Sequence, residues 1–102
     1  MAVRKTIEEV VVVDGNRDSW LTRCEAALHA QGFTGVAVNP TLLQLEGNYK
    51  KATVWGSLLV SLMPSGENAT SIVMRATANI DNVFALFSSP SQKIVNRFKE
   101  GL

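Results

Sequence analysis

Apolar and polar residues alternate most regularly in the second half of the chain. Between residues 70 and 80, even positions such as Ile72 and Met74 are apolar, whereas odd positions include Arg75 and Thr77. Successive side chains of a β-strand point to opposite faces, so this pattern predicts a strand with one buried face and one largely polar face.

Other segments are rich in β-branched and apolar residues and are bounded by turn-forming residues, which is typical of strands. They are residues 6–13, 33–39, 42–46 and 52–63. Gly47-Asn48 predicts a turn between the last two segments. Gly56 interrupts the interior of the longest segment, where we expect a β-bulge.

A helical period replaces the alternation after residue 16. Trp20, Cys24, Ala27 and Leu28 recur at intervals of about one helical turn, which predicts an amphipathic helix. Asn16 can cap its start, because its side chain can accept a hydrogen bond from an early backbone N–H. Gly32 can adopt the left-handed conformation that ends a helix.

A second helix is indicated near the end of the chain. Ser89 at the N-cap, Pro90 at the first helical position and Gln92 two residues later have the spacing of a capping box. Ile94, Val95 and Phe98 then supply an apolar side. The resulting order β-α-β-β-β-β-α predicts an α+β fold in which a curved antiparallel sheet packs against two helices.

Composition limits the classes of function. The 102 residues, 46% of them hydrophobic, suffice for one domain with one core, so residues 1–102 are expected to form a single domain. The formal net charge of +1 gives no basic field, and we expect no nucleic-acid partner. Cys24 is the only cysteine, and Glu8 and Glu9 interrupt the first apolar stretch, which favours a cytoplasmic protein. No apolar run reaches the length of a membrane span.

One motif resembles a calcium-binding loop. Asp14, Asn16, Asp18 and Glu25 occupy positions 1, 3, 5 and 12 of the EF-hand pattern, whose oxygen ligands suit a hard cation. Ser19 stands where that loop needs glycine, and a strand rather than a helix precedes it. We therefore expect no metal.

No catalytic constellation emerges from the remaining residues. Cys24 and His29 are five positions apart and point in different directions around the predicted helix, so they cannot act as nucleophile and base. Glu8 and Glu9 are neighbours on a strand and face opposite sides. We expect no enzyme activity and no cofactor.

The order of elements resembles that of the helix-grip group, and the central stretch WGSLLVSLMPSGENATSIVMRAT carries a second, more local resemblance. In this group, which includes the TATA-binding-protein half-repeat and the Bet v 1-like or START-like lipid carriers, an antiparallel sheet curls around a long C-terminal helix. The stretch is similar to a hairpin of small uncharacterised bacterial domains that carry a Trp-Gly pair. The resemblance implies a fold but no reaction. The helical insertion that closes the cavity of the longer carriers is missing here.

The polar faces of the two longest strands carry some large apolar residues. Leu59, Met63, Val73 and Arg75 are expected on one outward surface, and exposed apolar patches of this kind often mark contacts between proteins. We interpret these four residues as a candidate interface for a homodimer.

The segment NVFALF follows the last strand, at a point where the chain should turn. Phe84 and Phe87 could plug the end of the core, cover a ligand cleft as a lid, or contact another subunit. The main hypothesis is a non-enzymatic interaction or structural module that self-associates. The alternative is a small binding protein for a hydrophobic ligand held between the sheet and the C-terminal helix. Its candidate ligand-binding residues are Trp20, Trp55, Phe84, Phe87 and Phe98.

Overall fold

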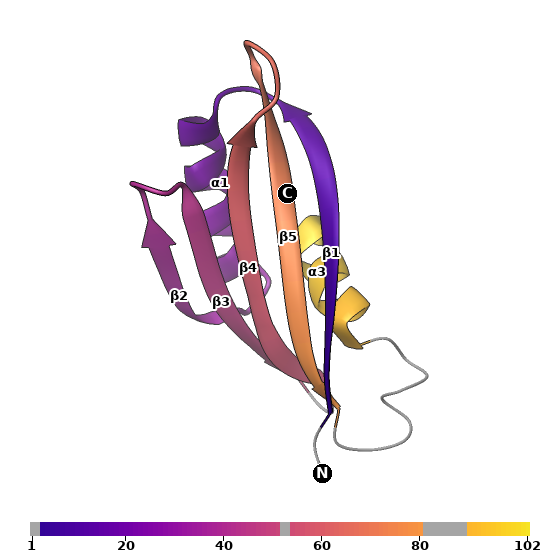
Figure 1. Cartoon of the computed structure of the whole chain (residues 1–102). Coiled ribbons are helices and arrows are strands. Elements are labelled where there is room, and N and C mark those ends of the chain that lie inside the picture. Colours follow the sequence, from indigo (N-terminus) through magenta and orange to yellow (C-terminus); the bar gives the residue numbers. More distant parts are fainter. Residues whose placement is uncertain (1–2, 52–53, 81–89) are drawn as a thin grey trace.

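The fold is described by a computed structural model that covers residues 3–51, 54–80 and 90–102. Its elements follow the order β-α-β-β-β-β-α that the sequence predicts, which confirms the expected α+β class (Figure 1). They are β1 (Val3–Asp14), α1 (Arg17–Ala30), β2 (Thr34–Asn39), β3 (Gln44–Lys51), β4 (Val54–Pro64), β5 (Ala69–Ile80) and α3 (Pro90–Glu100).

The strands form one five-stranded antiparallel sheet in the order β1-β5-β4-β3-β2. β2 to β5 follow one another as hairpins, while β1 crosses to pair with β5 along its whole length, from Val3 opposite Ile80 to Asp14 opposite Ala69. The first and last of the described strands are therefore neighbours, and β1 and β2 are the two edges of the sheet as described.

Both described helices lie on the same face of the sheet (Figure 1). α1 covers the half made by β2, β3 and β4, and α3 covers the half made by β5, β4 and β1. The core fills the layer between sheet and helices. Its fully or nearly fully buried apolar residues are Cys24, Ala27, Leu28, Phe33, Leu45, Tyr49, Leu58, Val60, Leu62, Ile72, Met74, Ala76, Ala78, Ile94, Val95 and Phe98.

The pairing register shows which side chains face the helices and which point away from them. Leu62 lies opposite Ile72, and Val60 opposite Met74, and all four are buried. The intervening positions, among them Met63, point to the other side, which no described element covers. We call this side the open face.

The ends of α1 form as the sequence predicts. The Asn16 side chain accepts a hydrogen bond from the Ser19 backbone N–H at 2.8 Å, which satisfies one of the free donors at the helix start. Gly32, with φ of 84°, reverses the chain after the helix. Asn16 and the other residues of the calcium-like pattern therefore belong to a strand end and a capped helix.

Two expectations about glycine are wrong. Gly47 and Asn48 lie inside β3 and do not form a turn. A Cβ on Gly47 would lie 3.3 Å from the Cβ of Phe33, so glycine there lets Phe33 pack onto the strand. The register also runs without a shift past Gly56, and the irregular pairing lies between Thr34 and Ala37 of β2.

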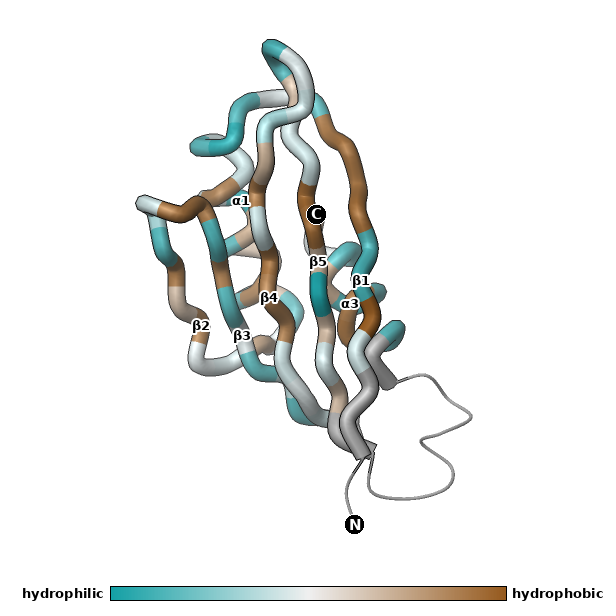
Figure 2. Tube along the Cα trace, viewed as in Figure 1, coloured by the Kyte–Doolittle hydropathy of each residue, from teal (hydrophilic) through white to brown (hydrophobic). Residues whose placement is uncertain are grey.

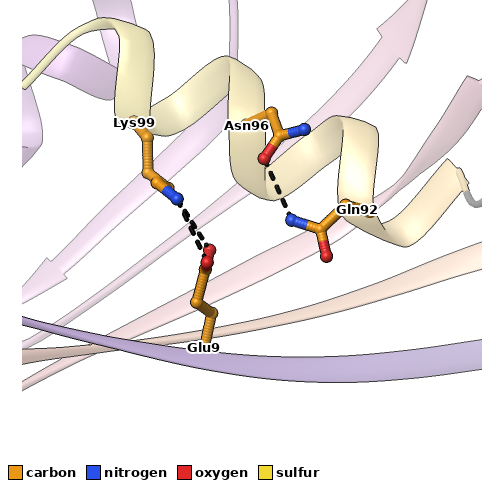
Figure 3. Close-up of polar contacts among 4 residues, drawn as sticks. All are labelled: Glu9, Gln92, Asn96 and Lys99. Carbon is orange, nitrogen blue, oxygen red and sulfur yellow. Dashed lines mark hydrogen bonds and ion pairs between the residues drawn. The ribbon is translucent and has the colours of Figure 1, made fainter.

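An ion pair ties α3 to the edge of the sheet. The Lys99 ammonium donates to both carboxylate oxygens of Glu9 on β1, at 3.1 and 3.2 Å (Figure 3). On the exposed side of the same helix, the Gln92 amide donates to the Asn96 side-chain oxygen at 2.9 Å. In the part of the chain that the structure describes, no helix is long and apolar enough to cross a membrane.

Candidate functional site

We call the face of the sheet that packs against the helices the floor. The side chains on this face change in size along the strands. At the end near the β4–β5 hairpin, the large side chains of Leu62 and Ile72 lie opposite each other. At the other end of these two strands, Gly56 lies opposite Ala78. Ala76, one pair further in, is also small. Gly56, Ala76 and Ala78 therefore form a group of small residues on the helix-facing side of β4 and β5, which we call the small-residue floor, and the larger Leu58 and Tyr49 pair with Ala76 and Gly56.

α3 presents an apolar side to this floor. Ile94, Val95 and Phe98 are fully buried, and Phe98 is the largest of the fully buried side chains among the described residues. Their spacing of one, three and four positions places them on one helical face. Phe98, predicted as a ligand-binding residue, thus lies in the core, on the buried side of the C-terminal half of α3.

Trp20 lies elsewhere. Its indole N–H donates to the Asp14 backbone carbonyl at 2.6 Å, and the Arg23 guanidinium carbon lies 4.8 Å from the ring centroid. Trp20 and Arg23 line a hollow of about 410 Å³ with Ala26, Gly101 and Leu102, between α1 and the last residues of the chain. This hollow is remote from the small-residue floor.

Trp55 lies on the open face. It pairs with Lys50 and shares its side of β4 with Ser57, because the strand continues without a register shift. Trp55 is half-buried and lines a hollow of about 430 Å³. Phe84 and Phe87 lie outside the described residues. The structure therefore brings none of Trp20, Trp55 and Phe98 together in one cavity.

The predicted interface residues do share a surface. Leu59 lies opposite Arg75 on the open face, and Val73 and Met63 follow along the same two strands. Met63 is 54% exposed.

β1 adds two apolar residues to this surface that the sequence reasoning missed. Val10 lies opposite Val73 and is 53% exposed, and Val12 is 60% exposed. Figure 2 shows that β1 is most hydrophobic in the half that leads to α1. We call Val10, Val12, Leu59, Met63 and Val73 the apolar patch.

Some charged groups among the described residues form pairs at the surface. The hydroxyl of Tyr49 and the carboxylate of Glu100, both bonded to Arg97, raise the pKa of that guanidinium. His29 lies 3.9 Å from Glu25 on an exposed part of α1. Among the described residues, no group of three or more His, Cys, Asp or Glu side chains could hold a metal ion.

Cys24 is fully buried in the core, and burial raises its thiol pKa from an ordinary 9.0 to about 12. The folded protein should therefore react slowly with iodoacetamide at pH 8, because the thiolate is the nucleophile. The unfolded chain releases the thiol proton near pH 9, whereas the folded chain holds it to about pH 12. Stability should accordingly fall as the pH rises through this window.

The contribution of Cys24 is isolated by comparison with Cys24→Ala, which leaves lysine and tyrosine titration in place. We expect urea denaturation at pH 8 and pH 10.5 to show a steeper loss of stability for the wild type than for the variant. Parallel losses would contradict the assignment of the shifted thiol.

Comparison with solved structures identifies the architecture. Norcoclaurine synthase from Thalictrum flavum, in a point mutant bound to a transition-state analogue, superposes with a TM-score of 0.70. The match covers 99% of this chain and 92% of that chain, at 10% sequence identity. The fold is the helix-grip fold of Bet v 1-like proteins. The helix-grip resemblance seen in the sequence is thereby confirmed.

Other matches show that this helix-grip architecture occurs in different proteins. The same synthase in complex with dopamine and hydroxybenzaldehyde matches with a TM-score of 0.68, at 9% identity, over 98% of this chain and 84% of that one. A chain of the adenylate sensor from AMP-activated protein kinase matches with a TM-score of 0.60, at 12% identity, over 86% of this chain and 93% of that one. No family model and no curated protein sequence matches the chain. At these identities the likeness establishes the fold alone.

Proposed function

We propose that this helix-grip domain is a non-catalytic binding protein that holds a small apolar molecule between the sheet and α3. The observation that carries the proposal is the small-residue floor formed by Gly56, Ala76 and Ala78. Ligand sites are commonly lined by apolar groups between packed elements. The fold adds support, because norcoclaurine synthase, which shares it, has been crystallised with dopamine and hydroxybenzaldehyde.

The absence of catalysis is part of the proposal. Glu9, the carboxylate that faces the helices, is bonded to Lys99, and the Cys24 thiol is held protonated by burial. Neither is poised as a base or a nucleophile at neutral pH. We therefore propose that the protein binds, carries or senses an apolar molecule.

The substitution Ala78→Leu tests where the ligand lies. If the floor borders a ligand site, the added side chain fills that site, so binding of the neutral apolar probe N-phenyl-1-naphthylamine should weaken at least about tenfold while the protein stays folded. If the floor is already packed, the variant should instead lose about 1–3 kcal/mol of stability. Fluorescence titration and urea denaturation measure the two effects.

Ala27→Leu is the matched control. Ala27 is buried under Gly101, where a Cβ on the glycine would lie only 3.0 Å from the Ala27 Cβ, so the larger side chain should destabilise without removing the probe site. Failure of the wild type to bind the probe, or equal destabilisation of both variants with unchanged binding, would refute the proposal.

Self-association is the second candidate function, and the apolar patch favours it. Val10 and Val12 on β1 and Met63 on β4 are each more than half exposed on the open face, on the two strands that flank β5. Val73→Lys places a charge in the middle of the patch. If the patch joins two copies, sedimentation velocity at about 100 µM should show a dimer for the wild type and a monomer for the variant. A wild-type monomer at this concentration would exclude this function.

A further inference from the structure

A row of short polar side chains crosses four strands on the open face. Thr34 lies opposite Asn48, Asn48 opposite Ser57, and Ser57 opposite Thr77. Neighbouring strands are about 4.8 Å apart, so the three hydroxyls and one amide form a continuous line of hydrogen-bonding groups. We call these four residues the polar row.

The next pair along the strands consists of Lys50 and Trp55, which face each other on β3 and β4. Both belong to the side of the sheet that carries the polar row. Together with the polar row, they line the hollow of about 430 Å³. Six of the eight lining residues point away from α1 and α3, while Tyr49 and Gly56 belong to the helix-facing side of the sheet, so most of the hollow lies on the open face.

Close backbone packing shapes this hollow. Gly56, which also lines the hollow, sits so close to β5 that a Cβ there would lie 2.7 Å from the Ala78 Cα. Gly35 has φ of 58°, and a Cβ there would lie 2.9 Å from the Asn48 side-chain nitrogen. Glycine at position 35 therefore gives the Asn48 amide its room. On the side of β1, a hydrogen bond of 3.0 Å joins the Thr77 hydroxyl to the Thr6 hydroxyl.

The electrostatic character of the hollow favours an anion. Lys50 is the one charged residue among the described residues that line it. The acids nearest on the same face, Glu8 and Glu46, lie in the row beyond the polar row, and Arg75 lies between them. A ligand at Trp55 therefore lies nearer to the Lys50 ammonium than to the carboxylates of Glu8 and Glu46.

We propose that this hollow binds a small molecule in which a flat ring is joined to an anionic group, as in a nucleoside monophosphate. The ring stacks on the Trp55 indole, because aromatic side chains provide a platform for any planar base. The polar row supplies neutral donors and acceptors to the ring edge and the linking group. The Lys50 ammonium pairs with the anion.

The proposal is tested by NMR titration of the intact protein with adenosine monophosphate, followed at the tryptophan indole N–H signals. The chain has two tryptophans, so the spectrum of Trp20→Phe assigns both signals. The Trp55 signal should shift and then saturate as ligand is added. The signal of Trp20, which lies in α1 and donates to Asp14 at the end of β1, should not shift. 4-Hydroxybenzoate provides a second anionic ring, and the tighter of the two ligands indicates whether the source is a nucleotide or an aromatic acid.

The role of Lys50 is tested separately. Lys50→Gln should weaken binding of the nucleotide about tenfold and leave the weaker binding of uncharged adenosine unchanged. Lys93→Gln, an exposed lysine on α3, is the matched control and should change neither. The proposal is overturned if neither anion shifts Trp55 up to about 10 mM, or if Lys50→Gln binds the nucleotide as well as the wild type. These outcomes do not depend on binding of the apolar probe, which reports on the other face.

Discussion

Gly56→Ala is expected to destabilise the protein by about 3 kcal/mol, at the upper end of what overpacking costs. The added methyl group would overlap the Thr77 carbonyl oxygen and lie 2.7 Å from the Ala78 Cα. Both neighbours are backbone atoms of a paired strand, so they cannot rotate aside as a flexible side chain could. β4 and β5 must separate locally, and the hydrogen bonds at this end of the pair weaken.

Gly66→Ala provides the control for Gly56→Ala. Gly66 lies in the β4–β5 hairpin with φ of 78°, and no atom lies within 4 Å of the position of an added Cβ. This variant should lose about 1 kcal/mol through backbone strain alone. Urea denaturation measures both losses as shifts of the midpoint at constant m. Similar losses for the two variants would show that close packing at Gly56 contributes nothing special.

Phe98→Ala is expected to cost about 3–5 kcal/mol, the range for removing a large aromatic side chain from a core. Phe98 is fully buried and anchors α3 on the sheet together with Ile94 and Val95. Its removal leaves a cavity beneath the helix and weakens the contact that holds the helix in place.

Asn96→Ala is the matched control for Phe98→Ala, because Asn96 is exposed on the same helix and bonds only to Gln92 in the described structure. Its stability should change by no more than about 0.5 kcal/mol. Thermal and urea unfolding of the two variants measure the difference. A loss below about 1 kcal/mol for Phe98→Ala would mean that α3 is not packed on the sheet as described.

The order and type of the elements could be predicted because each carries its own local signal. Residues 70–80 alternate as β5 does, and Asn16 and Gly32 bound α1 as expected. The boundaries of β3 could not be predicted in the same way. Gly47-Asn48 has the composition of a turn, and only the packing of Phe33 on Gly47 explains why the strand continues.

The candidate site was less predictable, because it depends on which face a side chain occupies. A bulge at Gly56 would have shifted the register by one residue, and such a shift moves every side chain beyond it to the other face. Without the bulge, Trp55 joins Ser57 on the open face, away from Phe98. The four valines at positions 10–13 do not alternate with polar residues, so only the pairing with β5 reveals that Val10 and Val12 point outward.

Native mass spectrometry of the gently purified wild type, beside Ala78→Leu, tests most directly whether an apolar molecule occupies the space between the sheet and α3. We predict an additional mass of a small apolar compound on the wild type that is absent from the variant. Bare polypeptide mass for both proteins, together with no uptake of an added apolar probe, would contradict the proposed function.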